Sequence, residues 1–498
     1  MGLARNSALN LAGAAVPIAV TLVTVPFYLS VIGIERYGVL SIAWLLLGYF
    51  GLFDLGLGRA AAQRIAGLAH ASPAARSDVF WTALWLNLVL GLVGAAVLVP
   101  VGHLAFGAME GLSGALAEET RAAVPWLAAS LPVATVSGLL SGALQGRERF
   151  VALNVIGSLG TILGSVSPLL VAVHYGADLR WLIAAALASR LLTSCLLFVS
   201  CRRCVPVEVP SLPRWSLVRD LLCFGGWVSV SSVIGPLLAS FDRLLIGVMV
   251  SAAAVTHYVV PFALVSRVQV LPQSLAGALF PLFASRPAGE MDRVKLKALR
   301  GLTLLMTPAV LAGLLVVEPF LIVWLGAELA DVSAPVAHIL LLGLWMNAAA
   351  RIPHASLQGS GRPDLVAKAH LGELVPYMGV LVPAIHAFGV TGAALAWTMR
   401  SAADAAILFL LDGTLKPAMR LLAFPAALVA CATVTVVSLP LDSAERWLVL
   451  AIIDALAVVW WTVNLLVEAG FVSIAPKTRF DMIDGRFEFI TLTCRKPE

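Results

Sequence analysis

Charged residues are scarce in this chain. Asp, Glu, Lys and Arg together make up 12% of the 498 residues, whereas 60% are hydrophobic, and the mean hydropathy is +0.95. No soluble protein of this size has such a composition, which excludes a soluble enzyme and predicts a polytopic membrane protein. The formal net charge of +5 therefore gives no argument for nucleic acid, and we expect no nucleic-acid partner.

Metal-ligand patterns are also lacking. The six cysteines include a single CxxC, formed by Cys201 and Cys204, with neither a second CxxC nor a nearby pair of histidines. Because a structural zinc ion takes four Cys or His ligands, we expect reduced thiols, no metal site and no cofactor.

Long hydrophobic runs, in contrast, fill the sequence. Since about 20 mostly apolar residues cross a bilayer as a helix, hydropathy predicts an all-α polytopic membrane protein with about fourteen transmembrane helices. The expected spans are residues 6–31, 37–66, 79–106, 122–146, 150–175, 181–200, 221–250, 255–284, 301–325, 335–358, 365–388, 390–411, 421–439 and 447–467.

Positive charge is distributed unevenly between the two sides of these spans. With the N-terminus placed in the cytoplasm, 24 of the 33 Lys and Arg residues fall on cytoplasmic loops and span ends, and only 4 fall on the outer side. Such a bias sets the orientation of a membrane protein, so both termini are expected in the cytoplasm.

Short sequence matches indicate an internal repeat. The tripeptide LQG ends the fourth span at 144–146 and the tenth at 357–359, and a tyrosine stands at the start of the second span (Tyr37) and of the eighth (Tyr258). Two six-helix units of the same orientation predict two pseudo-symmetric lobes around a central cavity, as in some secondary transporters. The expected parts are an N-terminal lobe (1–204), a cytoplasmic interfacial connector (205–220), a C-terminal lobe (221–412), an extra transmembrane hairpin (413–469) and a cytoplasmic tail (470–498).

Charges inside the spans are the candidate functional residues. A charge at membrane depth costs about 2.5–3.5 kcal/mol on insertion scales and must face protein or water. Five of these charges belong to arginines: Arg190, Arg243, Arg267, Arg351 and Arg400. Asp404 lies one helical turn after Arg400, and this spacing predicts a structural ion pair between them.

The second span carries Asp54 and Arg59 among glycines. A buried ion pair, snorkelling of Arg59 to the cytoplasmic face, and a water-accessible cavity for a charged substrate all fit this pattern. No lysine lies mid-span, and the five arginines outnumber the neighbouring aspartates. Because arginine stays charged and binds phosphate bidentately, this excess favours an anionic, phosphate-bearing substrate over a cationic drug.

Three stretches carry a family resemblance. They are residues 7–66 (beginning SALNLAGAAVPIAV), residues 142–157 (GALQGRERFVALNVIG) and residues 224–268 (with FDRLLIG followed by THY). Their sparse Gly, Pro, Asn, Asp and Tyr in an apolar context resemble the Wzx-type polysaccharide and oligosaccharide flippases of the multidrug/oligosaccharidyl-lipid/polysaccharide exporter superfamily.

This resemblance implies a flippase that moves a polyprenyl-pyrophosphate-linked oligosaccharide, an O-antigen, capsule or exopolysaccharide repeat unit, across the bacterial inner membrane by alternating access. It implies membrane lipid and other polysaccharide-assembly proteins as further partners, and no catalytic residues. By position it favours Arg59, Arg243, Arg267 and Arg351 as substrate-binding residues. It favours Asp54 and Asp242 as orienting or titrating residues, through which H⁺ or Na⁺ could couple; Glu318 is a further candidate for that coupling.

Two other functions stay open at this point. A multidrug/cation antiporter of the same superfamily would need an acidic, titrating cleft. A membrane glycosyltransferase or polysaccharide polymerase would need acidic groups on sizeable loops, whereas the outer loops here are short and poor in acids.

Overall fold

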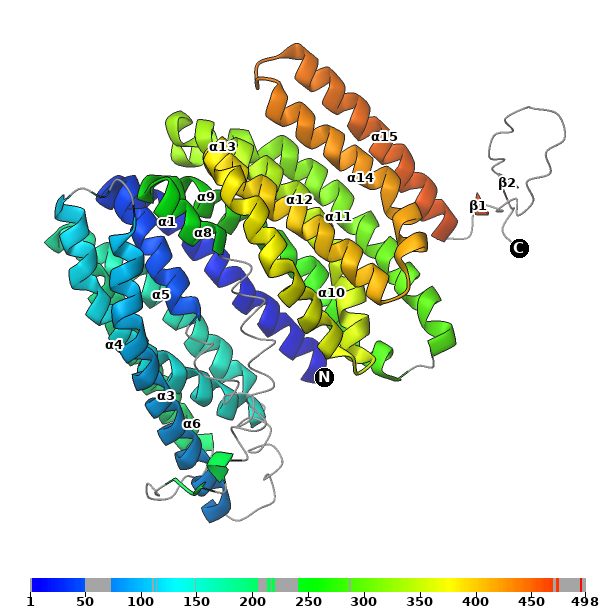
Figure 1. Cartoon of the computed structure of the whole chain (residues 1–498). Helices are drawn as coiled ribbons and strands as arrows, with labels where there is room; N and C mark the ends of the chain where they lie inside the picture. The colour runs from blue at the N-terminus through cyan, green and yellow to red at the C-terminus, as the bar shows by residue number, and fades with distance from the viewer. Residues whose placement is uncertain are drawn as a thin grey trace. The chain divides into compact units, whose positions relative to one another are not determined.

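The structure of the chain is a computed structural model. It describes residues 2–49, 73–109, 112, 114–147, 149–204, 213–215, 217–219, 241–285, 288–468, 472–473 and 493–494. The described helices are α1 (Gly2–Tyr49), α3 (Pro73–Gly107), α4 (Gly114–Gly146), α5 (Phe150–Tyr175), α6 (Leu179–Cys204), α8 (Phe241–Met249), α9 (Ala252–Val265), α10 (Val270–Ser285), α11 (Ala288–Leu325), α12 (Ala327–Gly359), α13 (Pro363–Leu411), α14 (Leu415–Ser438) and α15 (Ala444–Glu468) (Figure 1). A 3₁₀ turn, η2 (Ser266–Gln269), joins α9 to α10, and β1 (Val472–Ser473) pairs antiparallel with β2 (Thr493–Cys494).

Eleven of the described helices are long and apolar enough to cross a membrane. The predicted all-α membrane fold is therefore confirmed. The count of about fourteen spans stays a prediction, because much of the expected spans at 37–66 and 221–250 lies outside the described residues.

Two of the longest helices contain a break at a glycine. Gly33 in α1 has φ 78° and ψ 169°, and Gly389 in α13 has φ 56° and ψ −131°. Side chains with a Cβ rarely adopt these backbone angles, so glycine is the residue that allows the chain to turn there. Both breaks fall between spans that hydropathy separated, at 31–37 and at 388–390.

The outward faces of these helices are apolar. Along α3, Val89, Val93, Val97 and Val101 follow one another at intervals of four residues and are 48–55% exposed. Residues four apart share one face of a helix. A continuous exposed face of valine is unfavourable in water but suits contact with lipid chains.

The chain packs as two compact units. Unit 1 comprises Met1–Arg267, Ile322–Val336 and Asp364–Arg400, and unit 2 comprises Val268–Leu321, Ala337–Pro363 and Ser401–Glu498. The chain passes from one unit to the other within α11, α12 and α13 and at the η2 turn. The lobe boundaries expected from the sequence stay predictions.

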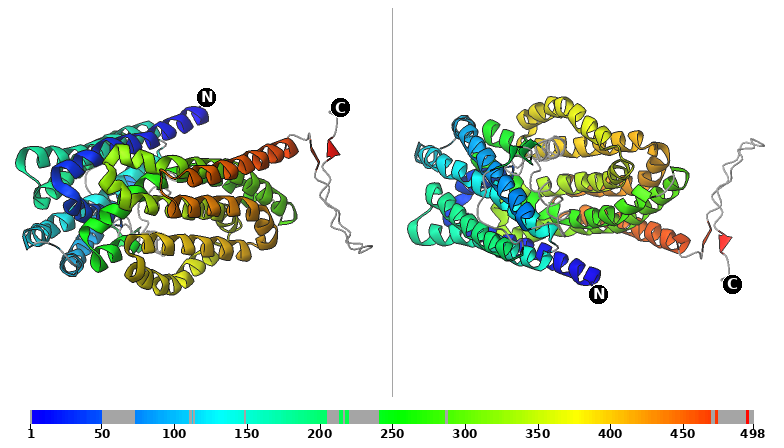
Figure 2. Two further views of the ribbon diagram at one scale, coloured as in Figure 1. Left: turned by 90° about the horizontal axis from the view of Figure 1, so that it is seen from above. Right: turned by 90° about the horizontal axis from the view of Figure 1, so that it is seen from below.

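Close packing of α3, α4 and α6 forms a core of unit 1. Figure 2 gives two further views of the helices. Phe80, Leu144 and Cys201 are buried together there, and the Cys201 thiol donates to the Leu140 carbonyl oxygen at 3.2 Å. A Cβ on Gly91 would lie 2.5 Å from the Pro132 Cα, so glycine allows α3 and α4 to approach closely. Cys201 of the CxxC is thus a core residue.

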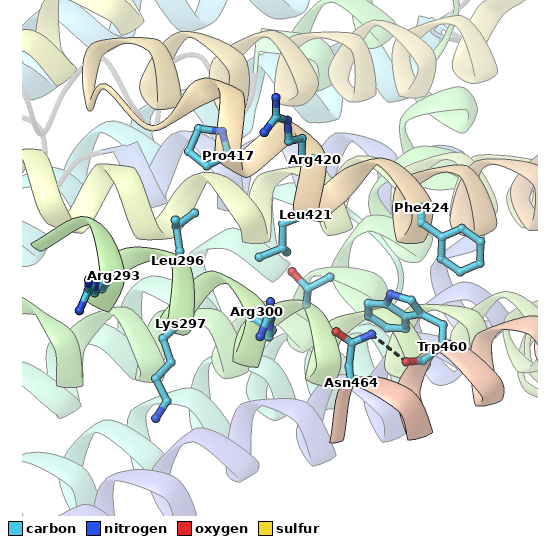
Figure 3. A pocket seen from close by; sticks show the side chains of 11 residues that line it. Arg293, Leu296, Lys297, Arg300, Pro417, Arg420, Leu421, Phe424, Trp460 and Asn464 are labelled. Atoms are coloured by element: carbon cyan, nitrogen blue, oxygen red, sulfur yellow. Dashed lines mark hydrogen bonds between the residues drawn. The ribbon is translucent and has the colours of Figure 1, made fainter. Parts of the chain in front are cut away.

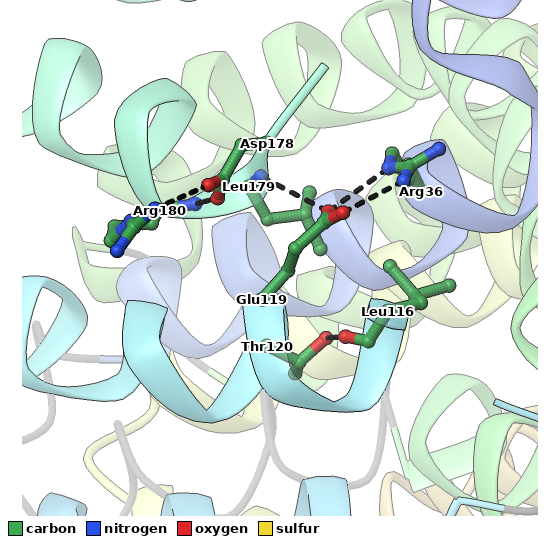
Figure 4. A network of polar contacts seen from close by, with 7 residues as sticks. All are labelled: Arg36, Leu116, Glu119, Thr120, Asp178, Leu179 and Arg180. Atoms are coloured by element: carbon green, nitrogen blue, oxygen red, sulfur yellow. Dashed lines mark hydrogen bonds and ion pairs between the residues drawn. The ribbon is translucent and has the colours of Figure 1, made fainter. Parts of the chain in front are cut away.

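A polar network ties three helices of unit 1 together (Figure 4). The Arg36 guanidinium donates to both Glu119 carboxylate oxygens, at 3.0 and 2.7 Å, and the Leu179 backbone N–H reaches the same carboxylate at 3.5 Å. Beside it, Arg180 pairs with Asp178 at 2.7 Å. A bidentate pair fixes geometry as well as charge, so this network holds the ends of α4 and α6 against α1.

In unit 2, the hairpin of α14 and α15 is anchored at both ends of α15. The Trp461 Nε1–H donates to the Leu304 carbonyl oxygen of α11 at 3.1 Å. Near the other end, Arg446 is 1% exposed and pairs with Glu318 of α11 at 2.5 Å. The ion pair at Glu318 and the hydrogen bond at Leu304 lie 14 residues apart on α11, and together they fix the register of α15 along α11.

Candidate functional site

A buried carboxylate lies at the centre of the candidate site in unit 1. Asp242 of α8 and Tyr258 of α9 are both 0% exposed, and the Tyr258 hydroxyl donates to Asp242 Oδ2. The backbone N–H of Arg243 donates to Asp242 Oδ1 at 2.8 Å. Each carboxylate oxygen thus has a donor, as a charge removed from water requires.

The neighbouring Arg243 rests on an aromatic surface. Its guanidinium carbon lies 4.2 Å from the centre of the Phe262 ring. That ring stacks on Tyr258 with centres 5.9 Å apart and meets the Trp397 ring edge-on at 5.6 Å. The Arg243 Nε is buried, and no described residue accepts a hydrogen bond from it. Contact with a ring face holds the guanidinium in position but does not use all of its N–H hydrogen-bond donors.

Arg400 of α13 adds a second cation to this cluster. Its Nη1 lies 3.5 Å from the Glu373 carboxylate, and its guanidinium carbon lies 5.4 Å from the centre of the Tyr377 ring. Both partners come from the half of α13 before the break at Gly389. Asp242 interacts electrostatically with both Arg243 and Arg400. We call the set the buried cluster: Asp242, Arg243, Tyr258, Phe262, Glu373, Tyr377, Trp397 and Arg400.

Within the buried cluster, two arginines meet two carboxylates. This balance corrects part of the sequence argument, which compared the in-span arginines with nearby aspartates alone and left Glu373 out. Counted over the described residues, the buried cluster therefore has no excess of positive charge.

Among the predicted site residues of unit 1 that the structure describes, Arg267 lies outside the buried cluster. It belongs to the η2 turn, and its Nη2 donates to the Thr21 hydroxyl of α1 at 3.2 Å. No described carboxylate forms an ion pair with it. Pro272 explains the turn, because a proline lacks an N–H and its ring clashes with the carbonyl four residues earlier. Arg267 is therefore a half-buried cation whose described partner is neutral.

Arg351 lies in unit 2. Its Nη2 donates to the Asn347 side-chain oxygen at 3.3 Å, and Gln269 donates to the same oxygen at 3.4 Å. Asp404 interacts with it electrostatically. Asp54 and Arg59 lie outside the described residues. That the four arginines form one substrate site stays a prediction.

Glu318, the further coupling candidate, has a structural role in this arrangement. Arg446 is its ion partner, and the buried His338 lies 4.0 Å away. The contact with Arg446 holds the Glu318 carboxylate in place, so Glu318 anchors α15 to α11.

The sequence indicated Asp242 and Arg243 but did not indicate Glu373 or the aromatic contacts of the buried cluster. Tyr258 was noticed in the sequence as part of the internal repeat. Its contact with Asp242 joins two helices, and the periodicity of a sequence does not indicate which residues of different helices meet. Among the described residues, no group of three or more His, Cys, Asp or Glu could hold a metal ion.

Comparison with known sequences identifies the family. Residues 3–286 match the family described as "Polysaccharide biosynthesis protein". The "Putative O-antigen transporter" of Shigella flexneri is 28% identical over 409 residues, which are 82% of this chain and 97% of that protein. The "Uncharacterized membrane protein EpsK" of Bacillus subtilis (strain 168) is 23% identical over 349 residues, 66% of each chain.

Solved structures share the fold. The lipid II flippase MurJ, in an inward closed conformation, matches with a TM-score of 0.70 at 11% identity, over 93% of this chain and 99% of that chain. An inward-facing multidrug resistance MATE family transporter of the MOP superfamily matches with a TM-score of 0.67 at 17% identity, over 82% of this chain and 98% of that chain. At these identities, the likeness establishes the fold alone.

The relative from Shigella flexneri is named as a putative transporter, which agrees with the expected class of a transporter rather than an enzyme. The family match covers more than half of the 498 residues. The chain, a multi-pass membrane protein, belongs to the polysaccharide biosynthesis protein family, as the resemblance in its sequence implied.

Proposed function

We propose that this protein is a flippase for a polyprenyl-pyrophosphate-linked oligosaccharide, an O-antigen, capsule or exopolysaccharide repeat unit, in the bacterial inner membrane. The observation that carries the proposal is Arg267: a permanent cation inside an apolar segment, with a hydroxyl as its described partner, at a helix break. Such a charge is costly in a membrane unless an anion or water meets it. Family membership and the relative named as an O-antigen transporter support the choice of substrate class.

The proposed mechanism needs no covalent step. The pyrophosphate and sugar head group enters a polar cavity between two lobes, while the polyprenyl chain stays in the bilayer. Arg267 and Arg243 offer N–H donors to phosphate oxygens, and Arg351 and Arg59 complete the proposed set. Binding drives the switch between inward-open and outward-open states only if the head group has different affinities for the two states.

The η2 turn provides a place for movement. A short 3₁₀ stretch within a long helix often marks a hinge, and here α9 ends at Val265 while α10 begins at Val270. Because Arg267 lies in that turn, a change in the angle between α9 and α10 moves the cation. Anion binding and helix movement are thus coupled through one residue.

Asp242 is the proposed coupling residue. In the ionised state it balances one positive charge of the buried cluster, and in the protonated state it leaves that charge uncompensated. An H⁺ gradient could therefore change the attraction of the cluster for an anion, and bound Na⁺ could replace the proton. Asp54 is a second proposed coupling residue. The proposed orientation places both termini in the cytoplasm, with other polysaccharide-assembly proteins as partners.

The test is transbilayer movement of a pyrophosphate-linked oligosaccharide lipid in proteoliposomes. We expect Arg267→Gln to lower the rate about tenfold or more, since one charge-assisted hydrogen bond is worth about 1.5–3 kcal/mol. Arg180→Gln is the matched control, because Arg180 pairs with Asp178 on the surface and has a side chain 45% exposed. Equal rates for the two variants would remove Arg267 from the site. If the native protein moves no such lipid but exports cationic dyes, the antiporter function replaces the flippase.

A further inference from the structure

A basic pocket in unit 2 has no part in the proposed transport cycle. It is a cavity of about 760 Å³ between α11, α14 and α15. Its basic residues are Arg293, Lys297 and Arg300 of α11 and Arg420 of α14 (Figure 3). The aromatic rings of Phe424 and Trp460 line it as well. We refer to it as the basic pocket.

Helix periodicity explains how these residues come together. The α11 cations are spaced i, i+4 and i+7, so they share one face of the helix. Arg420 and Phe424 are also four residues apart, on α14. The hairpin is fixed on α11 through the Trp461–Leu304 hydrogen bond, so the two faces are held opposite one another.

The pocket lining contains four basic residues and no acidic one. A fifth basic residue on the same stretch of α11, Lys295, points to a different partner: its Nζ lies 2.8 Å from the Asp412 carboxylate. Asp412 also accepts from Ser356 at 2.8 Å and from Thr414 at 3.0 Å. Asp292 lies 3.6 Å from the same Nζ, so two neighbouring acids pair with Lys295 and neither lines the pocket.

Basic residues at the ends of membrane helices are common, so charge alone would not indicate a site. Arg202 and Arg203 at the end of α6, for example, are exposed basic residues that do not line this pocket. In the basic pocket, by contrast, cations from two helices line one partly open cavity.

The lining of the pocket changes from basic to aromatic along the helix axes. Arg293 and Lys297 lie at one end of the pocket, Arg300 and Arg420 lie in its middle, and Phe424 and Trp460 lie at its other end (Figure 3). Charge nearest the helix ends and aromatic surface next to it match the order of a lipid, in which a charged head group lies above apolar chains. A free inorganic anion would use the charged end alone.

We propose that the basic pocket binds the phosphate head group of an anionic membrane phospholipid, with the upper part of an acyl chain against Phe424 and Trp460. By the predicted orientation this is a lipid of the cytoplasmic leaflet. The lipid fills the space between the hairpin and α11 and stabilises the hairpin on unit 2. The site is separate from the proposed transport residues, so it can be tested independently of the flippase activity.

The experiment is native mass spectrometry of the full chain released from nanodiscs of phosphatidylcholine with increasing phosphatidylglycerol. The test variant is Arg293→Gln, Lys297→Gln and Arg420→Gln together, which leaves Arg300 in place because Arg300 has other contacts. The matched control is Arg202→Gln, Arg203→Gln and Arg362→Gln, which removes three exposed cations from the same predicted membrane side. Each basic residue near a membrane surface contributes about 1 kcal/mol to attraction of anionic lipid, so the test variant should bind phosphatidylglycerol about 100-fold more weakly than native protein.

The outcomes separate the possible occupants. Retained phosphatidylglycerol on the native protein and the control, but not on the test variant, supports the proposal. Equal retention by all three proteins overturns it. Displacement of the phospholipid by millimolar inorganic phosphate would indicate a soluble anion, and selective displacement by a pyrophosphate-linked lipid would indicate a substrate site; either result also overturns it. If the triple variant fails to fold, Arg420→Gln alone, with about a fivefold loss expected, provides the same comparison.

Discussion

The buried cluster of unit 1 and the basic pocket of unit 2 both concentrate arginine, but they compensate its charge differently. Arg243 and Arg400 lie beside Asp242 and Glu373 and against aromatic rings. The basic pocket has four cations and no acid in its lining. The cluster is therefore close to neutral without any ligand, whereas the pocket is not.

This difference follows from depth and burial. Asp242 is fully buried, and a buried charge is tolerated only with a partner in contact. Arg293, Lys297 and Arg420 are exposed near helix ends, where head groups or water reach them. Removing a charge should consequently damage folding in the cluster and ligand binding in the pocket.

The largest expected effect is that of Asp242→Ala. It leaves Arg243 with one compensating charge fewer and leaves the Tyr258 hydroxyl without its acceptor. Breaking a buried charge pair costs about 3–5 kcal/mol, so the melting temperature in detergent should fall by many degrees. Asp364→Ala, at the exposed pair with Lys368, is the control and should change it little. A small effect at Asp242 would mean that water reaches the cluster.

The anchor of the hairpin provides the second test. Arg446→Gln removes the ion partner of Glu318, whose side chain is 19% exposed. Because water partly solvates Glu318, we expect a smaller loss of about 2–3 kcal/mol, measured as a lower midpoint of thermal unfolding. The double variant Arg446→Gln with Glu318→Gln should recover part of that loss. If the double variant is no more stable than the single one, the pair does not hold the hairpin.

Tyr258→Phe tests a single hydrogen bond of the buried cluster. Hydrogen bonds to a charged group contribute about 1.5–3 kcal/mol, and loss of this one leaves Asp242 with a backbone donor alone. We expect a moderate decrease in melting temperature, with Tyr175→Phe as control because Tyr175 is 82% exposed. Transport by this variant should also depend differently on pH if Asp242 is the coupling residue. An unchanged pH profile would separate Asp242 from coupling.

The membrane helices and one helix break are the parts of this fold that could be predicted from the sequence. Hydropathy predicted the all-α membrane fold, and the break at Gly389 falls between the two spans expected at 365–388 and 390–411. Both the apolar helices and the break at Gly389 depend on the local composition of the chain. The family, too, was recognisable from short stretches of sequence.

Contacts between helices were not predictable in this way. The spacing rule paired Arg400 with Asp404, but the structure places the Glu373 carboxylate 3.5 Å from Arg400. Glu373 precedes it by 27 residues and comes from the other side of the Gly389 break. A helix-wheel argument considers neighbours on one helix, so it missed both this partner and the Asp242–Tyr258 hydrogen bond. The charge balance of the cluster depends on those two contacts.

The smallest expected effect is that of Arg293→Gln in the basic pocket. Arg293 is exposed, and a surface substitution away from a packed core alters stability little. In detergent without added phospholipid, we therefore expect a melting temperature within about 1 °C of that of the native protein. With phosphatidylglycerol added, the native protein should gain stability in proportion to lipid occupancy, and this variant should gain less. A large loss without lipid would show that Arg293 stabilises the fold directly, and the contrast between the cluster and the pocket would then fail at that residue.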